Sequence, residues 1–281
     1  MQFNFTKWQG CGNDFVLVNG LTKDIISIQQ QVSAICNRSF GVGADGVIFI
    51  LPSQKCDFRM QIFNSDSSEA EMCGNGIRCF ARHVYECGLT DKSSITVETK
   101  AGIIKPQLIS CDSKENLVKV NMGKPILKAN EIPVSGFSDN HIISESITVD
   151  NKQFKITCVS MGNPHCVVFV DNIADVDIKK WGPVIEKYKI FPNKTNVEFV
   201  EVINRSTLRM RVWERGAGIT LACGTGACAT LTAAVLNNLC EKTAAVNLDG
   251  GTLSIEWNET DGSIYMTGPA KKVFEGIYYS E

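Results

Sequence analysis

Two segments of the chain alternate hydrophobic and polar residues with the period of two that is typical of a half-buried β-strand. They are residues 58–63 and 208–213. A turn-rich stretch follows each segment, and then a Cys-Gly-x-Gly sequence and a segment with helical character. The pattern therefore predicts the same succession of strand, turn and helix twice in one chain.

The segments behind the two Cys-Gly-x-Gly sequences are predicted to form helices over 75–87 and 225–239. Gly88 follows the first, and glycine readily adopts the left-handed conformation that ends helices. The second contains a run, 227–236, without a charged residue. Because a helix that is apolar on all sides is a buried one, we expect it at the centre of its domain. Further strands are predicted at 47–50, 94–97, 166–170 and 272–278.

A fixed offset of 150 residues relates the two halves of the chain. It joins Gly12-Asn13 to Gly162-Asn163, Arg59-Met60 to Arg209-Met210, and Cys73-Gly74 to Cys223-Gly224 (223 − 73 = 150). Chance would rarely keep one offset across three separate motifs, so we interpret the pattern as an internal duplication. It predicts an α/β (α+β) fold of two pseudo-symmetric domains. Each is a mixed sheet wrapped around a central buried helix, and the active site lies in the cleft between them.

The expected domain boundaries follow from this repeat. The first half covers 1–124 and is completed by a C-terminal strand within 270–281. The second half covers 125–269, and its first part, with Pro125 and Pro133, is expected to be a crossover between the halves.

Composition narrows the function classes. The 281 residues have a formal net charge of −2, which argues against a nucleic-acid or polyanion binder. No apolar run approaches the roughly 18 residues of a membrane span, so no membrane partner is expected. The N-terminus has no signal-peptide pattern, and we expect a cytoplasmic protein.

Twelve cysteines occur without a Cys-x-x-Cys pair and with three histidines, so a metal site is not expected. Most cysteines, including Cys79 and Cys228, should be small core residues, and Cys11 should be structural.

Cys73 and Cys223 stand apart because each directly precedes a predicted helix. Unpaired N–H groups and a partial positive charge at a helix N-terminus stabilise a thiolate, so the pKa of both thiols is expected to fall below about 8.5. A carboxylate can bind at the same place. Two such sites on opposite faces of one α-carbon suit a two-base inversion, in which one thiolate removes a proton and the other thiol delivers one. The alternative is a pair of ordinary buried cysteines beside tight turns.

Eight motifs along the chain resemble the diaminopimelate epimerase family. They are spread over nearly the whole chain and stand in the family's order. These motifs are residues 12–15, 41–46, 63–66, 72–79, 162–165, 196–199, 213–216 and 222–229. The combination is specific, whereas Cys-Gly-x-Gly alone also occurs in proline racemase-like enzymes.

The resemblance implies an isomerase that interconverts LL- and meso-2,6-diaminopimelate for lysine and peptidoglycan-precursor synthesis. It implies no pyridoxal phosphate or other cofactor, and a homodimer. Cys73 and Cys223 become the catalytic acid/base pair, and His165 lines the site. The residues that would hold the reacting carboxylate through their backbone are Gly74, Asn75, Gly224 and Thr225. Those that would hold the amino groups and the distal carboxylate are Asn13, Asn64, Asn163, Asn196, Glu214 and Arg215.

The chemistry of the distal residues agrees with this substrate. Arg215 can grip a carboxylate with two hydrogen bonds, and Glu214 can bind an ammonium group. The alternative is a solvated ion pair at a strand end. The chain departs from the common family pattern at Ser67, where many members have glycine, which we expect to affect the local loop only. Gly46 receives no side-chain role.

Other functions remain open at this point. The main alternative is a racemase or epimerase for another amino acid, such as proline or hydroxyproline. A non-enzymatic amino-acid binding protein and a redox or metal protein are the others.

Overall fold

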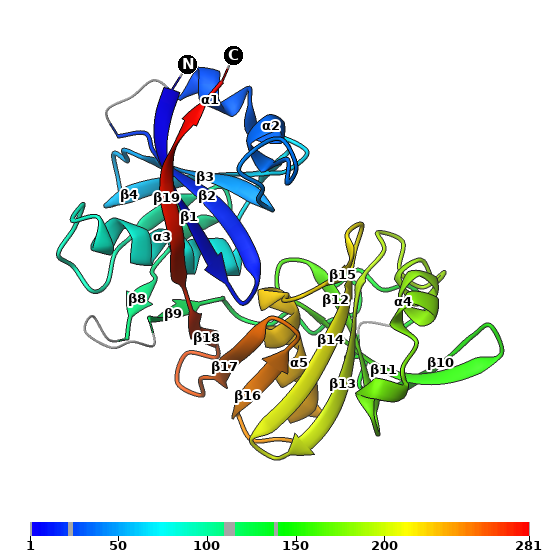
Figure 1. The fold of residues 1–281 in the computed structure, drawn as a ribbon. Coiled ribbons are helices and arrows are strands. Elements are labelled where there is room, and N and C mark those ends of the chain that lie inside the picture. Colours follow the sequence, from blue (N-terminus) through cyan, green and yellow to red (C-terminus); the bar gives the residue numbers. More distant parts are fainter. Residues whose placement is uncertain (1, 22–24, 110–115, 138–139, 281) are drawn as a thin grey trace. The chain divides into compact units, whose positions relative to one another are not determined.

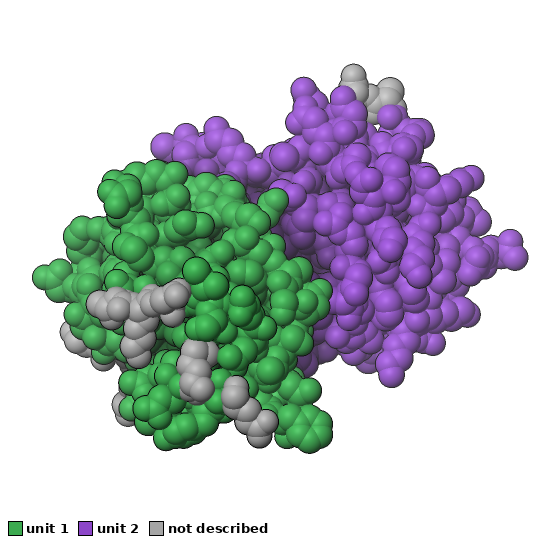
Figure 2. Space-filling model, turned by 90° about the horizontal axis from the view of Figure 1, so that it is seen from above, with its two compact units in different colours: residues 1–121, 267–281 green, residues 122–266 purple. Residues whose placement is uncertain are grey.

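The structure is a computed structural model that describes residues 2–21, 25–109, 116–137 and 140–280. The chain divides into two compact units, residues 1–121 with 267–281 (unit 1) and residues 122–266 (unit 2) (Figures 1 and 2). Met1 and Glu281, at the ends of the expected first half, lie outside the described residues. Within the described part of the chain, no helix is both long enough and apolar enough to cross a membrane.

Unit 1 is built on a mixed sheet with β19 at one edge and β7 at the other. In spatial order its strands are β19 (Lys271–Tyr279), β1 (Gln2–Gly10), β2 (Asn13–Asn19), β3 (Gly46–Leu51), β4 (Phe58–Asn64), β6 (Val97–Thr99) and β7 (Gly102–Ile104). Strand β5 (Glu69–Ala70) pairs with β4, and β8 (Gln107–Leu108) pairs with β9 (Leu117–Asn121). The helices are α1 (Ile26–Gln29), α2 (Val32–Cys36) and α3 (Gly74–Glu86).

Unit 2 repeats this plan. In spatial order its strands are β10 (Glu145–Val149), β11 (Lys152–Ser160), β12 (Pro164–Val170), β13 (Asn196–Asn204), β14 (Thr207–Glu214), β16 (Thr243–Leu248), β17 (Gly251–Trp257) and β18 (Ile264–Pro269). The last three residues of β18 belong to unit 1. Strand β15 (Gly218–Thr220) pairs with β14. The helices are a 3₁₀ turn (Ile173–Asp175), α4 (Ile178–Glu186) and α5 (Gly224–Leu236).

The duplication seen in the sequence is present in the topology. Helices α3 and α5 begin 150 residues apart and also end 150 residues apart (224 − 74 and 236 − 86). In unit 1 the parallel pairs are β2–β3 and β4–β6, and in unit 2 they are β12–β13 and β14–β16. The predicted fold class, a mixed α/β fold built from two similar halves, is confirmed.

Each central helix is buried against the strands of its own unit. Helix α5 contacts β11 to β14, β16 and β17, and Cys228 and Leu231 on it are fully buried. Helix α3 contacts β1 to β4 (Figure 1). Cys79 and Phe80 on it are fully buried. The prediction that Cys79 and Cys228 are core residues is therefore confirmed. These contacts with several strands position the first turn of each helix within its unit.

Two predicted elements differ from the structure. Helix α5 ends at Leu236 rather than at 239, because Asn238 adopts a left-handed φ of 57° and the Asn237 side chain donates to Ala233 O at 2.8 Å. The strand predicted at 94–97 is displaced to β6, Val97–Thr99. There the backbone N–H and hydroxyl of Thr96 both donate to the Asp57 carboxylate.

Candidate active site

In unit 1 the Cys73 thiol caps the N-terminus of α3. The backbone N–H of Gly76 donates to Cys73 Sγ over 3.4 Å. The thiol also lies 3.6 Å from the side-chain oxygen of Asn13, which accepts a second hydrogen bond from Asn75 Nδ2 at 3.2 Å. Three residues expected in the site, Cys73, Asn13 and Asn75, are thus brought together.

Two side chains with no role in the sequence analysis hold this group in place. Asp45 accepts a hydrogen bond from Asn13 Nδ2 at 2.7 Å. Arg78 is fully buried, and its guanidinium donates to Asn75 Oδ1 at 2.9 Å and to the Gly74 carbonyl at 3.1 Å. Both residues stand inside motifs that match the family, which was the only signal in the sequence that pointed to them.

Asn64 lies at the end of β4 and starts the turn that leads toward Cys73. Its side chain donates to Ser68 Oγ at 3.0 Å, and its carbonyl accepts from Ser67 N at 2.9 Å. Ser67 has a φ of 68°, a conformation that favours glycine, the residue that the family resemblance leads us to expect here. Gly46 is paired with Asn64, and a Cβ at Gly46 would lie 2.5 Å from the Phe63 carbonyl. Gly46 therefore serves close backbone packing.

In unit 2 the Cys223 thiol caps α5 in the same way. Its sulfur accepts from Gly226 N at 3.3 Å and lies 3.5 Å from Thr225 Oγ1. The first turn of α5 thereby brings Gly224 and Thr225 beside the thiol, as α3 brings Gly74 and Asn75 beside Cys73.

The expectation of a lowered pKa is wrong for Cys223. Burial raises the pKa of this thiol well above its ordinary value, and the negative charges of Glu214 and Glu198 raise it further. The hydrogen bonds from Thr225 and Gly226 act in the opposite direction but do not outweigh burial. The sequence motif showed the helix N-terminus but not the two carboxylates that the fold brings near it.

Asn163 and His165 lie next to this thiol. Asn163 Nδ2 donates to Thr225 Oγ1 at 3.4 Å, and His165 Nε2 lies 3.0 Å from Asn163 Oδ1. The other ring nitrogen, Nδ1, lies 2.7 Å from Glu198 Oε1. Glu198 is a further residue without a role in the sequence analysis, although it belongs to a matching motif.

The distal residues are held at the end of β14. Burial raises the pKa of the Glu214 carboxyl, which accepts a hydrogen bond from Thr220. The exposed Arg215 donates from its backbone to Asn196 Oδ1 at 2.9 Å and from its guanidinium to the Asn193 carbonyl at 3.2 Å. Among the ion pairs of the described residues, Glu214 and Arg215 do not form one with each other, so the alternative of a simple surface pair does not describe them.

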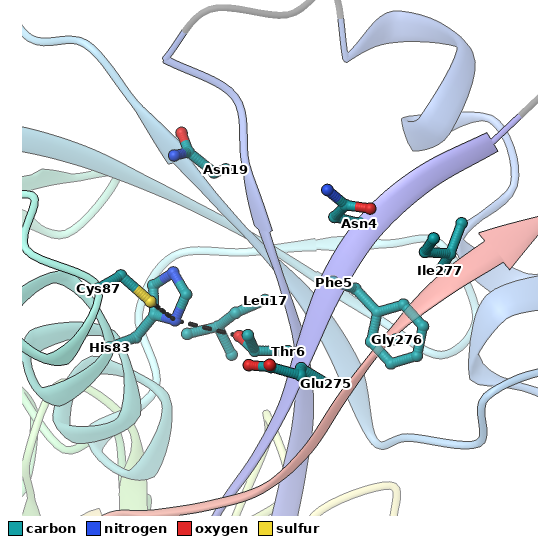
Figure 3. A pocket seen from close by; sticks show the side chains of 10 residues that line it. All are labelled: Asn4, Phe5, Thr6, Leu17, Asn19, His83, Cys87, Glu275, Gly276 and Ile277. Atoms are coloured by element: carbon teal, nitrogen blue, oxygen red, sulfur yellow. Dashed lines mark hydrogen bonds between the residues drawn. The ribbon is translucent and has the colours of Figure 1, made fainter.

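Unit 1 also contains a cavity of about 480 Å³ that includes none of the predicted site residues (Figure 3). It is lined by residues of β1, β2, β19 and the C-terminal part of α3, whereas Cys73 caps the opposite end of that helix. His83 in its wall lies 3.0 Å from Thr6 Oγ1 and 3.6 Å from Cys87 Sγ through Nδ1. Burial lowers the pKa of His83 to about 4.

Comparison with solved structures defines the class of fold. The structure is similar to a phenazine biosynthesis protein of the PhzF family from Bacillus anthracis (TM-score 0.73, 19% identity, 100% of both chains). It is also similar to a probable proline racemase from Agrobacterium radiobacter (TM-score 0.70, 14% identity, 97% of this chain and 92% of the other). A hydroxyproline epimerase from Agrobacterium vitis gives a TM-score of 0.69 at 12% identity, covering 99% of this chain and 92% of the other. At such identities the likeness shows the fold alone, a duplicated fold shared with racemases and epimerases.

Sequence comparison identifies the family within this class. The family model described as diaminopimelate epimerase matches residues 5–128 and 157–273. The chain is 54% identical to a diaminopimelate epimerase of Acetivibrio thermocellus over 97% of both chains. It is 53% identical to one of Methanococcus maripaludis, over 97% of this chain and 98% of the other. The chain belongs to the diaminopimelate epimerase family, and it is an enzyme of the isomerase class.

Proposed function

We propose that this epimerase inverts one stereocentre of diaminopimelate, interconverting the LL and meso forms, with Cys73 and Cys223 as the two bases. One observation carries the proposal. At matched positions of the two units, a cysteine thiol caps the buried central helix and accepts the backbone N–H three residues ahead, over 3.4 Å in unit 1 and 3.3 Å in unit 2. A duplicated thiol of this kind is what a two-sided proton transfer needs.

In the proposed reaction one thiol acts on each face of the substrate α-carbon. Backbone N–H groups of 74–75 and 224–225 bind the α-carboxylate and stabilise the negative charge that develops on it. One thiolate takes the α-proton and becomes a thiol, while the opposite thiol gives its proton to the other face and becomes a thiolate. The proton balance closes within the pair, and this scheme calls for no cofactor.

The environment of Cys223 supports an assignment of roles in the free enzyme. Burial and two nearby carboxylates raise the pKa of this thiol, which favours its protonated form. Cys223 would then start as the acid and Cys73 as the base. Because the reaction leaves the pair in the opposite protonation state, the reverse reaction uses the opposite assignment.

The second amino-acid group of diaminopimelate accounts for the distal residues. We assign Arg215 to the distal carboxylate and Glu214 to an ammonium group. His165 lines the site in this proposal. The amide side chains that would supply mixed donors and acceptors are Asn13, Asn64, Asn163 and Asn196.

Hydrogen exchange in heavy water tests the two-base reaction. LL-diaminopimelate incubated with reduced enzyme in D₂O should yield meso product carrying deuterium at the inverted carbon. Early in the reaction, recovered substrate should carry little deuterium. Cys73→Ala and Cys223→Ala should each abolish inversion. Product without deuterium, or inversion that survives either substitution, would rule out the mechanism.

Arg215→Ala tests the substrate. The variant should raise KM for diaminopimelate by about tenfold or more, the effect of losing an interaction with a charged group worth roughly 1.5–3 kcal/mol. Arg205→Ala is the matched control, because Arg205 is an exposed arginine paired with Glu241 in unit 2. A substrate panel with proline and hydroxyproline separates this proposal from the other amino-acid epimerases. Equal turnover of those substrates would contradict it.

The proposal extends to assembly and location. We propose that the two epimerase halves are 1–124 with 270–281 and 125–269, and units 1 and 2, whose bounds lie three residues earlier, support this division. We also propose a homodimer, supported by exposed apolar side chains on the edge strand β19, namely Val273, Ile277 and Tyr279 at 56%, 51% and 70% exposure. The double variant Val273→Glu and Ile277→Glu should then sediment as a monomer. Cytoplasmic location is supported by the eleven described cysteines, none of which forms a disulfide, as expected in a reducing compartment.

A further inference from the structure

A buried carboxylate lies against the first turn of α5. Glu198 is fully buried on β13, and its Oε1 is so close to the helix that a Cβ at Gly226 would lie 2.8 Å from it. Oε1 also lies 2.7 Å from His165 Nδ1, while Oε2 has no hydrogen-bond partner among the described residues. Burying a carboxylate costs free energy that a single hydrogen bond only partly offsets. Its presence here therefore calls for an explanation.

Hydrogen bonds connect this carboxylate to the Cys223 thiol. His165 links Glu198 to Asn163 Oδ1, which lies 3.0 Å from Nε2. The Asn163 amide nitrogen in turn donates to Thr225 Oγ1 over 3.4 Å, and that hydroxyl lies 3.5 Å from Cys223 Sγ. Each of these side chains contacts the next, so an unbroken series of contacts runs from Glu198 to the Cys223 sulfur.

Unit 1 shows that the fold does not need this charged pair. At the matched positions it has Phe15 and Ile48 (165 − 150 and 198 − 150), both buried. The strand registers correspond, since Leu17 pairs with Ile48 and Val167 pairs with Glu198. A Cβ at Gly76 would meet Ile48 Cδ1 at 3.1 Å, where Gly226 would meet the Glu198 oxygen. The same framework thus accepts an apolar pair, which points to a role of the charged pair at the Cys223 site.

We propose that Glu198 is a positioning residue that, through His165, fixes the side-chain amide of Asn163 and with it Thr225 beside the Cys223 thiol. The inference rests on the proposed assignment of Cys223 to the catalytic pair. A carboxylate and an amide oxygen only accept hydrogen bonds, so both ring nitrogens of His165 must donate, Nδ1–H to Glu198 and Nε2–H to Asn163 Oδ1. Glu198 therefore favours the ring that carries both protons and prevents it from flipping. Nε2 is then held against Asn163 Oδ1, which turns the amide N–H groups toward Thr225.

Three substitutions at one position test this role. Glu198→Ile introduces the residue that unit 1 has at the matched position, and it should lower kcat about tenfold while KM changes less than about threefold. The loss corresponds to about 1.4 kcal/mol in the transition state. Glu198→Gln keeps an acceptor for Nδ1–H and should restore part of the lost kcat. Glu201→Gln is the control, because Glu201 lies on the same strand and accepts from Ile173 N instead of from the site. Wild-type kcat in Glu198→Ile would overturn the proposal.

A double-mutant cycle shows whether Glu198 acts through His165. His165→Phe should lower kcat by itself, and adding Glu198→Ile should cause little further loss. This double variant reproduces the apolar pair of unit 1 and relieves the unpaired carboxylate, so it should fold even if His165→Phe is unstable. If the fold-loss in kcat of the double variant equals the product of the two single losses, Glu198 acts independently of His165, and the proposal is overturned.

The imidazole N–H resonances give a readout that does not depend on activity. The chain has three histidines, so the Nδ1 proton of His165 can be assigned from the His165→Phe spectrum. We expect a hydrogen-bonded, downfield resonance that persists, shifted, in Glu198→Gln and is lost in Glu198→Ile. If it is unchanged in Glu198→Ile, the carboxylate does not orient the ring. Full activity of Cys223→Ala would instead refute the assignment of Cys223, which separates the two failures.

Discussion

Ser67 adopts a backbone conformation that is unfavourable for a residue with a side chain. Ser67 has a φ of 68° in the turn between β4 and β5, and its N–H donates to the Asn64 carbonyl at 2.9 Å. A residue with a Cβ is disfavoured in this left-handed region by roughly 1–2 kcal/mol, whereas glycine is not. The turn is nevertheless retained, because hydrogen bonds at both ends hold it.

Ser67→Gly should therefore raise the free energy of unfolding by about 1 kcal/mol, after the greater flexibility of glycine in the unfolded chain is deducted. Urea denaturation at constant pH measures the change. Ser65→Gly is the matched control, because Ser65 lies in the same turn without a positive φ and should gain nothing. An equal gain in both variants would show that the strain at Ser67 is not the cause.

The carboxylates near Cys223 are a second effect at the residue scale. The sequence placed this cysteine at a helix N-terminus, where a thiolate is stabilised. In the structure, burial and the charges of Glu214 and Glu198 raise its pKa instead. The helix N-terminus was predicted correctly, but the direction of the pKa shift at Cys223 depends on burial and on side chains from β13 and β14.

At the scale of elements, α3 and α5 each begin with a cysteine that caps the helix, but different side chains surround the two first turns. A Cβ at Gly76 would meet methyl groups of Ile48 and Ile62 at 3.1 and 3.3 Å, and these ends of flexible side chains can shift. A Cβ at Gly226 would meet Glu198 Oε1 at 2.8 Å and Cys223 Sγ at 3.2 Å. These two atoms belong to the hydrogen-bonded group around the thiol.

Gly226→Ala should therefore lower kcat by about tenfold or more, equivalent to at least about 1.4 kcal/mol, while Gly76→Ala should cost less than about threefold. Steady-state kinetics on both variants, with melting temperatures as a check on folding, make the comparison. Equal losses would mean that the helix starts respond to the added methyl group alone and not to its neighbours.

At the scale of the whole molecule, His83 is expected to couple folding to pH. Burial lowers its pKa to about 4 in the folded protein, against about 6.5 for an unperturbed histidine. Between these values the unfolded chain binds the proton more readily, so stability is complete above about pH 6.5 and falls as the pH drops toward 4. The shift corresponds to a loss of up to about 3 kcal/mol.

Denaturation curves at pH 7 and pH 4.5 test this coupling. His83→Phe keeps a ring against Trp8 and removes the titration, so this variant should lose less stability on acidification than the wild type. His141→Gln, at an exposed position, is the control and should behave like the wild type. An identical acid loss in His83→Phe would show that other groups dominate it.

The sequence by itself determined the duplicated fold, the helix starts and the family, because these follow from a constant offset and from motifs of adjacent residues. The expectation that Cys73 and Cys223 are the catalytic pair, with Asn13, Asn163 and Arg215 as binding residues, rests on the same motifs. Only the tertiary structure revealed Arg78 beneath Asn75, Glu198 behind His165, and the raised pKa of Cys223. The physical reason is that hydrogen bonding and burial depend on groups distant in the chain, such as residues 165 and 198, which parallel strand pairing brings together. The repeat in the sequence predicts the backbone plan that the two halves share. The charged groups near each cysteine differ between the halves because they depend on which side chains the fold packs there.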